Sequence, residues 1–239
     1  MNRTSTKTFI VLFLFAIICA CHKSEIAPPP RQLLIEQIPS RNNVIVVLGS
    51  SSAQGVGAEP LDSSWASKLK NRLLSDFQTF KFVNLAMSGY TTFKILPSSF
   101  KTADTLRNVD KALTYKPDLI IISLPSNDMA NGYTDKETLD NFKTVVEKIK
   151  AAKVAFIIMS TQPRDFPSFE ARQKLALFND KLEENFPNKI LNVFNKLASP
   201  SLFINVVYGT GDGIHLNNKG HNVIFQTITN DSLFRYIMY

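Results

Sequence analysis

The feature that most constrains this chain is an apolar run that ends abruptly in glycine and serine. Residues 44–48 read Val-Ile-Val-Val-Leu, and Gly49 and three serines follow them at once. A short run of β-branched residues without polar alternation is typical of a parallel strand that is buried on both faces. Sheets of this kind bind ligands outside the carboxyl ends of their strands. The three serines therefore lie where a nucleophile is expected.

Further apolar runs alternate with helical patterns along the rest of the chain. We expect strands near residues 82–85, 119–124, 154–159 and 190–194. We expect helices near residues 63–77, 100–115, 136–152, 168–185 and 219–231, the first with Asp62 as its N-cap. Strands that alternate with helices indicate a parallel sheet with right-handed crossovers. We therefore predict an α/β fold: a three-layer α/β/α sandwich around a five-stranded parallel sheet in the flavodoxin-like order 2-1-3-4-5.

The first residues have the pattern of a targeting segment. A positive start is followed by an apolar core at residues 9–18, which is too short to span a membrane because a span needs about 20 residues. The sequence Ile-Cys-Ala-Cys that ends at Cys21 resembles the lipobox of bacterial lipoproteins. We expect a signal peptide at residues 1–20, a lipidated Cys21 with a flexible tether at 21–42, and one domain at 43–239. An ordinary secretory signal, in which Cys21 has no special role, is the alternative.

Composition excludes some classes of protein. The chain has 239 residues, of which 44% are hydrophobic, and this is ample for one core. Its net charge of +7 is spread without a long Lys/Arg block, so we expect no nucleic-acid partner. Both cysteines precede residue 22, so the domain has neither disulfides nor thiolate metal ligands. The sequence leaves the oligomeric state open.

Histidine and aspartate near the C-terminal end could activate a serine. The chain has three histidines, and His22 lies in the tether, so the base would be His215 or His221. Asp212 precedes His215 by three residues, a spacing that places both side chains on the same face of a turn. The carboxylate can then accept the Nδ1 proton and leave Nε2 facing a serine. We assign His221 to the packing of the last helix.

The three serines, taken alone, are also compatible with roles other than nucleophile. Hydroxyls at a strand end also cap helices or bind phosphate. A P-loop is not indicated, because no Gly-Lys pair follows the serines, and Pro60 stands where a dinucleotide-binding loop needs glycine. Ala53 stands where the nucleophile turn of an α/β-hydrolase needs glycine.

Polar residues follow the other expected strands as well. Gly89, Asn127, Asp128, Gln162 and Arg164 come after the second, third and fourth strands. On a parallel sheet these loops share one edge with the three serines. We expect Asp128 to brace its own loop, and Arg164 either to be solvated or to contact an anionic or sugar substrate.

Four blocks of the chain together resemble one family, the SGNH hydrolases, also called GDSL esterases and lipases. The blocks are Gly49-Ser50-Ser51, residues 84–89, Pro125-Ser126-Asn127-Asp128 and Asp212-Gly213-Ile214-His215. The resemblance implies that Ser51 is the nucleophile, His215 the base and Asp212 its partner. It also implies an oxyanion hole formed by the backbone N–H groups of Ser51 and Gly89 and by the Asn127 side chain.

Two positions depart from the family's pattern. Ser50 replaces the usual aspartate, and Pro125 replaces the glycine of the third block. Both changes put the rate and the substrate in question more than the fold. We take Ser50, Gln162 and Arg164 as candidate substrate-binding residues.

The expected function is that of an exported serine esterase. It would hydrolyse small-acyl esters, O-acetylated glycans or lysophospholipid-type lipids through an acyl-enzyme, with no metal or organic cofactor. As a lipoprotein it would be anchored in the cell envelope, at the outer membrane, through Cys21. The alternatives are a catalytically inactive glycan- or lipid-binding lipoprotein on the same fold, and an O-acyltransferase.

Overall fold

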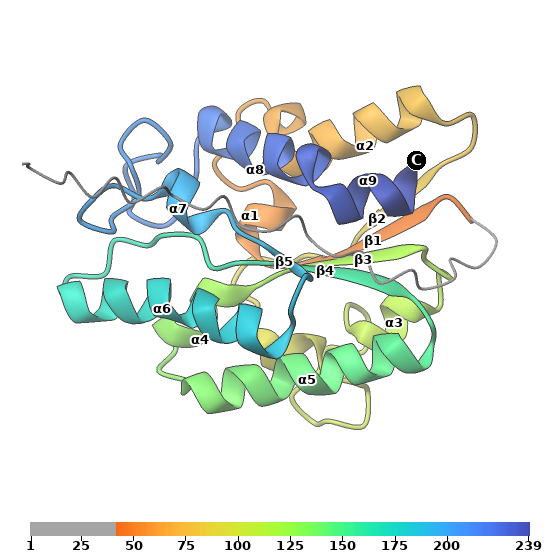
Figure 1. The fold of residues 1–239 in the computed structure, drawn as a ribbon, viewed down its shortest axis with the longest axis horizontal. Helices are drawn as coiled ribbons and strands as arrows, with labels where there is room; N and C mark the ends of the chain where they lie inside the picture. Colours follow the sequence, from red (N-terminus) through yellow and green to blue (C-terminus); the bar gives the residue numbers. More distant parts are fainter. Residues whose placement is uncertain (1–41) are drawn as a thin grey trace, which may run out of the picture. The chain divides into compact units, whose positions relative to one another are not determined.

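The fold is built on a central parallel sheet. The computed structural model describes residues 42–239, apart from the side chain of Pro125, so the signal peptide, Cys21 and nearly all of the tether lie outside the described residues. The strands are β1 (Val44–Gly49), β2 (Lys81–Asn84), β3 (Leu119–Ser123), β4 (Ala155–Met159) and β5 (Ile190–Leu191). Every pair is parallel, and the order is β2-β1-β3-β4-β5 (Figure 1). The predicted α/β fold and strand order are confirmed.

Helices cover both faces of this sheet (Figure 1). One layer consists of α2 (Trp65–Asp76), α8 (Asn218–Asn230) and α9 (Ser232–Met238). The opposite layer consists of α3 (Val109–Leu113), α5 (Asp135–Ala151) and α6 (Phe169–Asn185). The short helices α1 (Ser51–Gln54), α4 (Pro125–Ala130) and α7 (Phe194–Leu197) lie toward one end of the sheet, α1 and α7 on the side of α8 and α4 on the side of α5. Two 3₁₀ turns, η1 (Leu61–Ser63) and η2 (Thr92–Ile95), complete the described elements.

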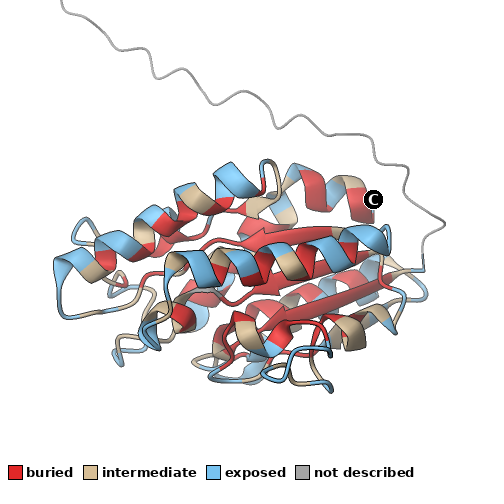
Figure 2. Ribbon diagram, turned by 90° about the horizontal axis from the view of Figure 1, so that it is seen from below, coloured by how far each residue is buried: buried red, intermediate tan, exposed pale blue. Residues whose placement is uncertain are grey.

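The interior strand β1 contributes side chains to two separate cores. Ile45 and Val47 belong to the core under α2 and α8, whereas Val46 and Leu48 belong to the core under α5 and α6. Successive side chains of a strand point to opposite faces, which is why a run with no polar alternation can be buried throughout. All four side chains are fully buried, and Figure 2 shows the strands as a buried layer between helices that are buried on one side only.

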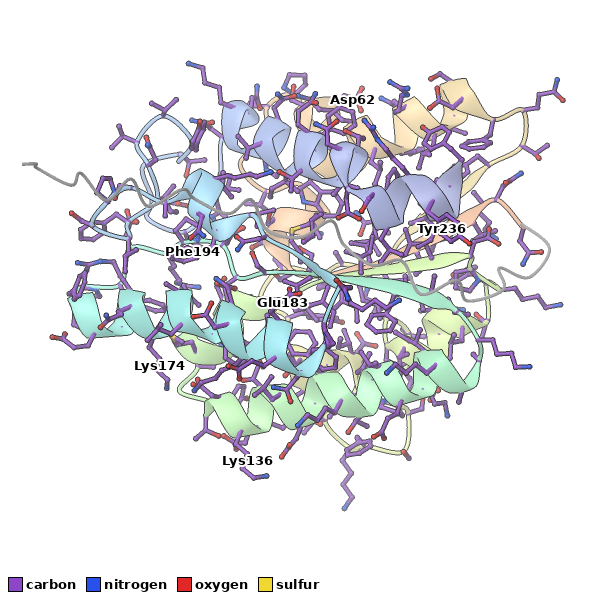
Figure 3. All side chains as sticks on the ribbon, in the orientation of Figure 1. Asp62, Lys136, Lys174, Glu183, Phe194 and Tyr236 are labelled. Carbon is purple, nitrogen blue, oxygen red and sulfur yellow. The ribbon has the colours of Figure 1, made fainter. Side chains whose placement is uncertain are left out.

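The outer faces of the helices are charged. Lys136 of α5 and Lys174 of α6 are exposed on one layer, and Asp62 lies on the opposite layer beside α2 and α8 (Figure 3). Helix α5 begins with a capping box, in which Thr134 and Glu137 each accept a hydrogen bond from the other's backbone N–H. No helix of the described part of the chain is long and apolar enough to cross a bilayer.

The predicted N-cap of α2, the helix expected at residues 63–77, is wrong by two residues. Asp62 lies in η1, and α2 is capped by Ser64, whose Oγ accepts a hydrogen bond from the Ser67 backbone N–H. Ser64 is almost fully buried beneath the helix, while Asp62 is exposed. The extended backbone that a cap requires therefore falls at Ser64.

The helix predicted near residues 100–115 is mostly absent. Only α3 forms, with Asn108 as its N-cap. The preceding segment is irregular, and Asp104 captures a backbone group that a helix would use, because its carboxylate accepts from the Leu106 N–H. Aspartate competes with helix formation in this way.

The fifth strand is also shorter than the predicted residues 190–194. It ends at Leu191, and the chain then turns into α7. The Ser160 hydroxyl accepts hydrogen bonds from the N–H groups of Val193 and Phe194, which replaces strand pairing. The helix α9 was not predicted, although Asp231 followed by apolar residues at helical spacing was a usable signal.

Candidate active site

Ser51 stands at the first position of α1, just after the interior strand β1. The backbone N–H of Ser50 continues the pairing with β3 by donating to the Ser123 carbonyl at 3.1 Å, and the chain then turns into the helix. Ser50 and Ser52 are buried, with exposed fractions of 8% and 5%, whereas Ser51 is only partly buried. Ser51 is therefore the most accessible of the three serines that end this strand.

Ser51 meets a histidine from the other end of the domain. The Oγ of Ser51 lies 3.1 Å from Nε2 of His215, and Nδ1 of His215 lies 2.6 Å from Oδ2 of Asp212. Because a carboxylate can only accept, Nδ1 carries the proton toward Asp212 and Nε2 is left to accept the serine hydroxyl proton. The structure thus brings together the three residues that were predicted to form a triad.

Asp212 is held as an anion by its own loop. Burial acts to raise the pKa of Asp212, but hydrogen bonds from the His215 backbone, the His215 ring and the Ile214 backbone outweigh it. The pKa of this carboxyl therefore lies well below its ordinary value. Its Oδ1 accepts from the N–H groups of Ile214 and His215, both at 2.8 Å. The backbone of the loop therefore holds the Asp212 carboxylate in place independently of its contact with the His215 ring.

The loop after β4 fastens the histidine loop in place. Nε2 of Gln162 donates to the Ile214 carbonyl at 2.8 Å, and the Asp165 backbone N–H donates to the Gly213 carbonyl at 2.9 Å. The structure therefore gives Gln162, a candidate substrate-binding residue, a contact to the histidine loop. Asp165 was not singled out in the sequence, because its partners Ile204 and Gly213 are 39 residues or more away.

The loop after β2 is tied to α1. Oε1 of Gln54 accepts from both the backbone N–H and the hydroxyl of Ser88, at 2.9 and 2.7 Å. Asn84 donates to the Ala53 carbonyl at 2.7 Å. These contacts place Gly89, which has a positive φ of 80°, beside the serine turn. Within the described residues, the backbone N–H groups of Ser51 and Gly89 have no hydrogen-bond acceptor.

Asn127 lies in the first turn of α4 and is held at both ends of its amide. Nδ2 donates to the Tyr90 carbonyl at 2.9 Å, and Oδ1 accepts from Nη1 of Arg164 at 3.1 Å. Arg164 thus contacts Asn127, and is only partly buried. Nδ2 carries a second proton, which these contacts leave free.

Asp128 is buried in the same helix, and its carboxylate braces the neighbouring loop at Thr92, whereas we expected it to brace its own loop. It is 1% exposed and accepts from the backbone N–H and hydroxyl of Thr92, which in turn accepts from Nδ2 of Asn141 at 2.9 Å. Burial raises the pKa of Asp128 to about 6, although the hydrogen bonds from Thr92 oppose this. The loop that carries Tyr90 is thereby fixed against α5.

His221 cannot replace His215 as a base. It is fully buried, and its Nε2 lies 3.1 Å from the Val56 carbonyl while its Nδ1 accepts from the Trp65 N–H at 3.4 Å. Burial lowers its pKa, which favours the neutral ring that these two contacts require. Both ring nitrogens are occupied in packing α2 against α8.

A shallow pocket lies beside the histidine loop. It has a volume of about 550 Å³ and combines exposed apolar side chains with amide and ammonium groups. Its lining residues are Gly57, Glu59, Val206, Val207, Asn217, Asn218 and Lys219. Asn217 follows His215 by two residues along the chain, so the pocket borders the segment that carries the histidine.

Comparisons with known proteins agree with this fold. The family model of the GDSL-like lipase/acylhydrolase family matches residues 47–223, which include Ser51 and His215. The chain resembles an arylesterase of Vibrio mimicus with 29% identity over 115 residues, which cover 48% of this chain and 52% of that protein. The match thus spans about half the length of that relative.

Solved structures show the same architecture. The esterase EstA of Pseudoalteromonas sp., solved as inhibited by monoethylphosphonate, superimposes with a TM-score of 0.61 at 20% identity, over 83% of this chain and all of that one. A GDSL-like lipase of Bacteroides thetaiotaomicron gives a TM-score of 0.61 at 20% identity, over 82% of this chain and 87% of that one. The fold is that of known esterases and lipases, and the family model is that of acylhydrolases. The chain belongs to the GDSL-like lipase/acylhydrolase family.

Proposed function

We propose that this protein hydrolyses carboxylic esters with Ser51 as the nucleophile. The observation that carries the proposal is the continuous contact from Ser51 Oγ through His215 to Asp212, at 3.1 and 2.6 Å. A serine hydroxyl is a weak nucleophile until a positioned base removes its proton. Here the base lies within hydrogen-bonding distance and is itself oriented by a carboxylate.

The reaction follows from these contacts. The Oγ of Ser51 attacks the ester carbonyl carbon while its proton moves to Nε2 of His215. The tetrahedral intermediate collapses, the C–O bond to the alcohol breaks, and His215 gives its proton to the leaving oxygen. Water then attacks the acyl-enzyme with His215 again as base, which releases the acid and restores the serine. Asp212 stabilises the imidazolium in both half-reactions and is not protonated itself.

Three donors surround the position of the developing oxyanion in this proposal. They are the backbone N–H groups of Ser51 and Gly89, which have no acceptor among residues 42–239, and the second proton on Nδ2 of Asn127. They come from the ends of three neighbouring strands, so the sheet fixes them before substrate binds. Loss of one such donor typically lowers kcat by about 10²–10³.

The direct test is covalent labelling of Ser51. A fluorophosphonate should attach to the Ser51 peptide, as identified by mass spectrometry, and Ser51→Ala should abolish both labelling and p-nitrophenyl acetate hydrolysis. The relative EstA has a structure inhibited by a phosphonate, which supports this choice of probe. Absence of labelling with retained glycan or lipid binding would instead indicate the inactive binding protein. Acyl transfer to a sugar acceptor in place of water would indicate the O-acyltransferase.

The substrate class in this proposal is an ester with a small acyl group and a partly polar alcohol. The pocket beside the site supports it, because Val206 and Val207 lie next to Asn217 and Lys219 there. O-acetylated glycans and lysophospholipid-type lipids both present such an alcohol. A panel of esters of graded acyl length, with acetylated oligosaccharides and lysophospholipids, separates these two substrate classes. A steep preference for acetyl groups on sugars would exclude lysophospholipids as the substrate.

We further propose that the protein is exported and anchored through a lipid on Cys21. The support is the leader and lipobox pattern of residues 1–21. In cells that carry the full-length chain, radioactive palmitate should label the protein, and Cys21→Ala should release it from the membrane fraction. Labelling that survives the substitution, or a protein that never enters the membrane fraction, would contradict the proposal.

A further inference from the structure

The amide of Asn127 has one orientation that satisfies both of its neighbours. Its Nδ2 faces the Tyr90 carbonyl, which can only accept, and its Oδ1 faces the Arg164 guanidinium, which can only donate. Rotating the amide by half a turn would place two acceptors together at one end and two donors together at the other. Arg164 and Tyr90 therefore fix which end of the side chain carries its N–H groups.

Arg164 is partly buried, and its side chain makes a single hydrogen bond among the described residues. Burial lowers the pKa of its guanidinium, and nearby Asp212 acts in the opposite direction. Within the described residues no carboxylate forms an ion pair with it, and its hydrogen-bond partner there is Oδ1 of Asn127. Its guanidinium also lies over the ring of Phe166, 5.5 Å from the centroid.

Arg172, by contrast, is buried and holds several backbone segments together. It is 6% exposed, stacks 3.7 Å from the centre of the Phe203 ring, and donates to three backbone carbonyls. Among the described residues, Arg164 has no comparable set of carbonyl partners. Its polar contact goes to the one side chain that was assigned to the oxyanion hole.

We propose that Arg164 is a positioning residue for the oxyanion hole, acting through Asn127. By holding Oδ1 it aims the second Nδ2 proton at the substrate's carbonyl oxygen. A charged donor on Oδ1 also draws electron density from the amide, which makes its N–H groups stronger donors. The inference rests on the proposed function and gives Arg164 a role other than the substrate contact expected from the sequence.

The test is a double-mutant cycle on a neutral ester, p-nitrophenyl acetate. Asn127→Ala should lower kcat about 10²–10³-fold, and Arg164→Ala about 10-fold or more, each with KM changed less than about twofold. Adding Arg164→Ala to Asn127→Ala should cost nothing further, because the group that it positions is gone. Arg164→Lys should recover part of kcat, since an ammonium can still donate to Oδ1. Arg72→Ala, in an exposed ion pair with Asp76, is the control and should leave kcat unchanged.

Several results would overturn the inference. Independent, multiplicative losses in the double variant would show that Arg164 does not act through Asn127. A rise in KM confined to anionic esters would make Arg164 a substrate contact, and an unchanged kcat in Arg164→Ala would remove its role. Thermal unfolding of each variant shows whether a loss of kcat comes from misfolding. Arg164→Lys keeps the positive charge, so we expect it to fold as the wild type. If Ser51→Ala kept the wild-type rate, the proposed function itself would fail; if Ser51→Ala is inactive, only the role of Arg164 is in question.

Discussion

Asp212 contacts His215 through both carboxylate oxygens. Oδ2 lies 2.6 Å from the ring Nδ1, and Oδ1 accepts from the His215 backbone N–H at 2.8 Å. The same residue is thus held at its ring and at its main chain by one carboxylate. The imidazole is oriented by a local turn that does not depend on the distant serine.

The first prediction concerns this pair. Asp212→Asn should lower kcat about 10³–10⁴-fold, because an amide neither stabilises the imidazolium nor fixes the tautomer. The measurement is kcat and KM for p-nitrophenyl acetate, with KM nearly unchanged. The exposed Asp62, changed to Asn in the same way, is the matched control and should behave as the wild type. A loss smaller than tenfold would mean that Asp212 does not support the base.

The second prediction separates the three serines. Ser51→Ala should abolish turnover, while Ser52→Ala should retain it, because the Ser52 hydroxyl is buried and has no hydrogen-bond partner in the described part of the chain. Removing an unpaired buried hydroxyl should leave the free energy of unfolding unchanged or raise it by about 1 kcal/mol. Urea unfolding and kcat test both statements. Turnover by Ser51→Ala that disappears in Ser50→Ala or Ser52→Ala would move the nucleophile.

The third prediction concerns the glycine that lies against the histidine loop. Gly57 has a φ of 91°, and a Cβ there would lie 2.1 Å from the Leu216 carbonyl oxygen. Gly57→Ala should therefore displace the residue next to His215 and destabilise the fold by about 2 kcal/mol or more, with a fall in kcat. The control is Gly132→Ala, because Gly132 has a φ of 79° but open space around it. It should cost only about 1 kcal/mol, from the backbone alone. Equal losses in the two variants would mean that the contact with Leu216 has no effect.

The fourth prediction is a pH dependence of stability. The pKa of Asp128 is raised to about 6 in the folded protein, above its ordinary value of 3.8. The stability that this carboxyl contributes is therefore complete below about pH 4 and is lost as the pH rises through 6, by about 3 kcal/mol at most. Asp128→Asn cannot ionise, so its free energy of unfolding in urea should fall less between pH 4.5 and 8. Identical slopes for the two proteins would exclude Asp128 as the titrating group.

Local sequence determined the parts of the fold that depend on neighbouring residues. The apolar run of β1 must be buried on both faces, and the strand–helix alternation leads to a parallel sheet with its loops at one edge. The Asp212–His215 pair is likewise local, because the carboxylate closes its own turn over the next three residues. These features were predictable from spacing and residue type.

Other features depended on residues far apart in the chain. The predicted helix at 100–115 gave way to loops, because the Asp104 carboxylate captures the Leu106 N–H and the Asp104 N–H itself donates to the Lys94 carbonyl, which lies before the predicted helix. Strand β5 stopped early because the Ser160 hydroxyl, from the loop after β4, accepts the N–H groups that would have extended it. Propensity could not show either outcome, since the competing partners are tertiary or side-chain acceptors.

The sequence by itself determined which residue types would gather at the carboxyl edge of the sheet. Only the tertiary structure decided how they pair: Ser51 with His215, 164 residues away, and Asn127 with Arg164, 37 residues away. The physical reason is that the shared direction of parallel strands fixes the edge at which the loop after each strand emerges. Hydrogen-bond geometry, accurate to tenths of an ångström, is set by the packing of all the strands and helices together.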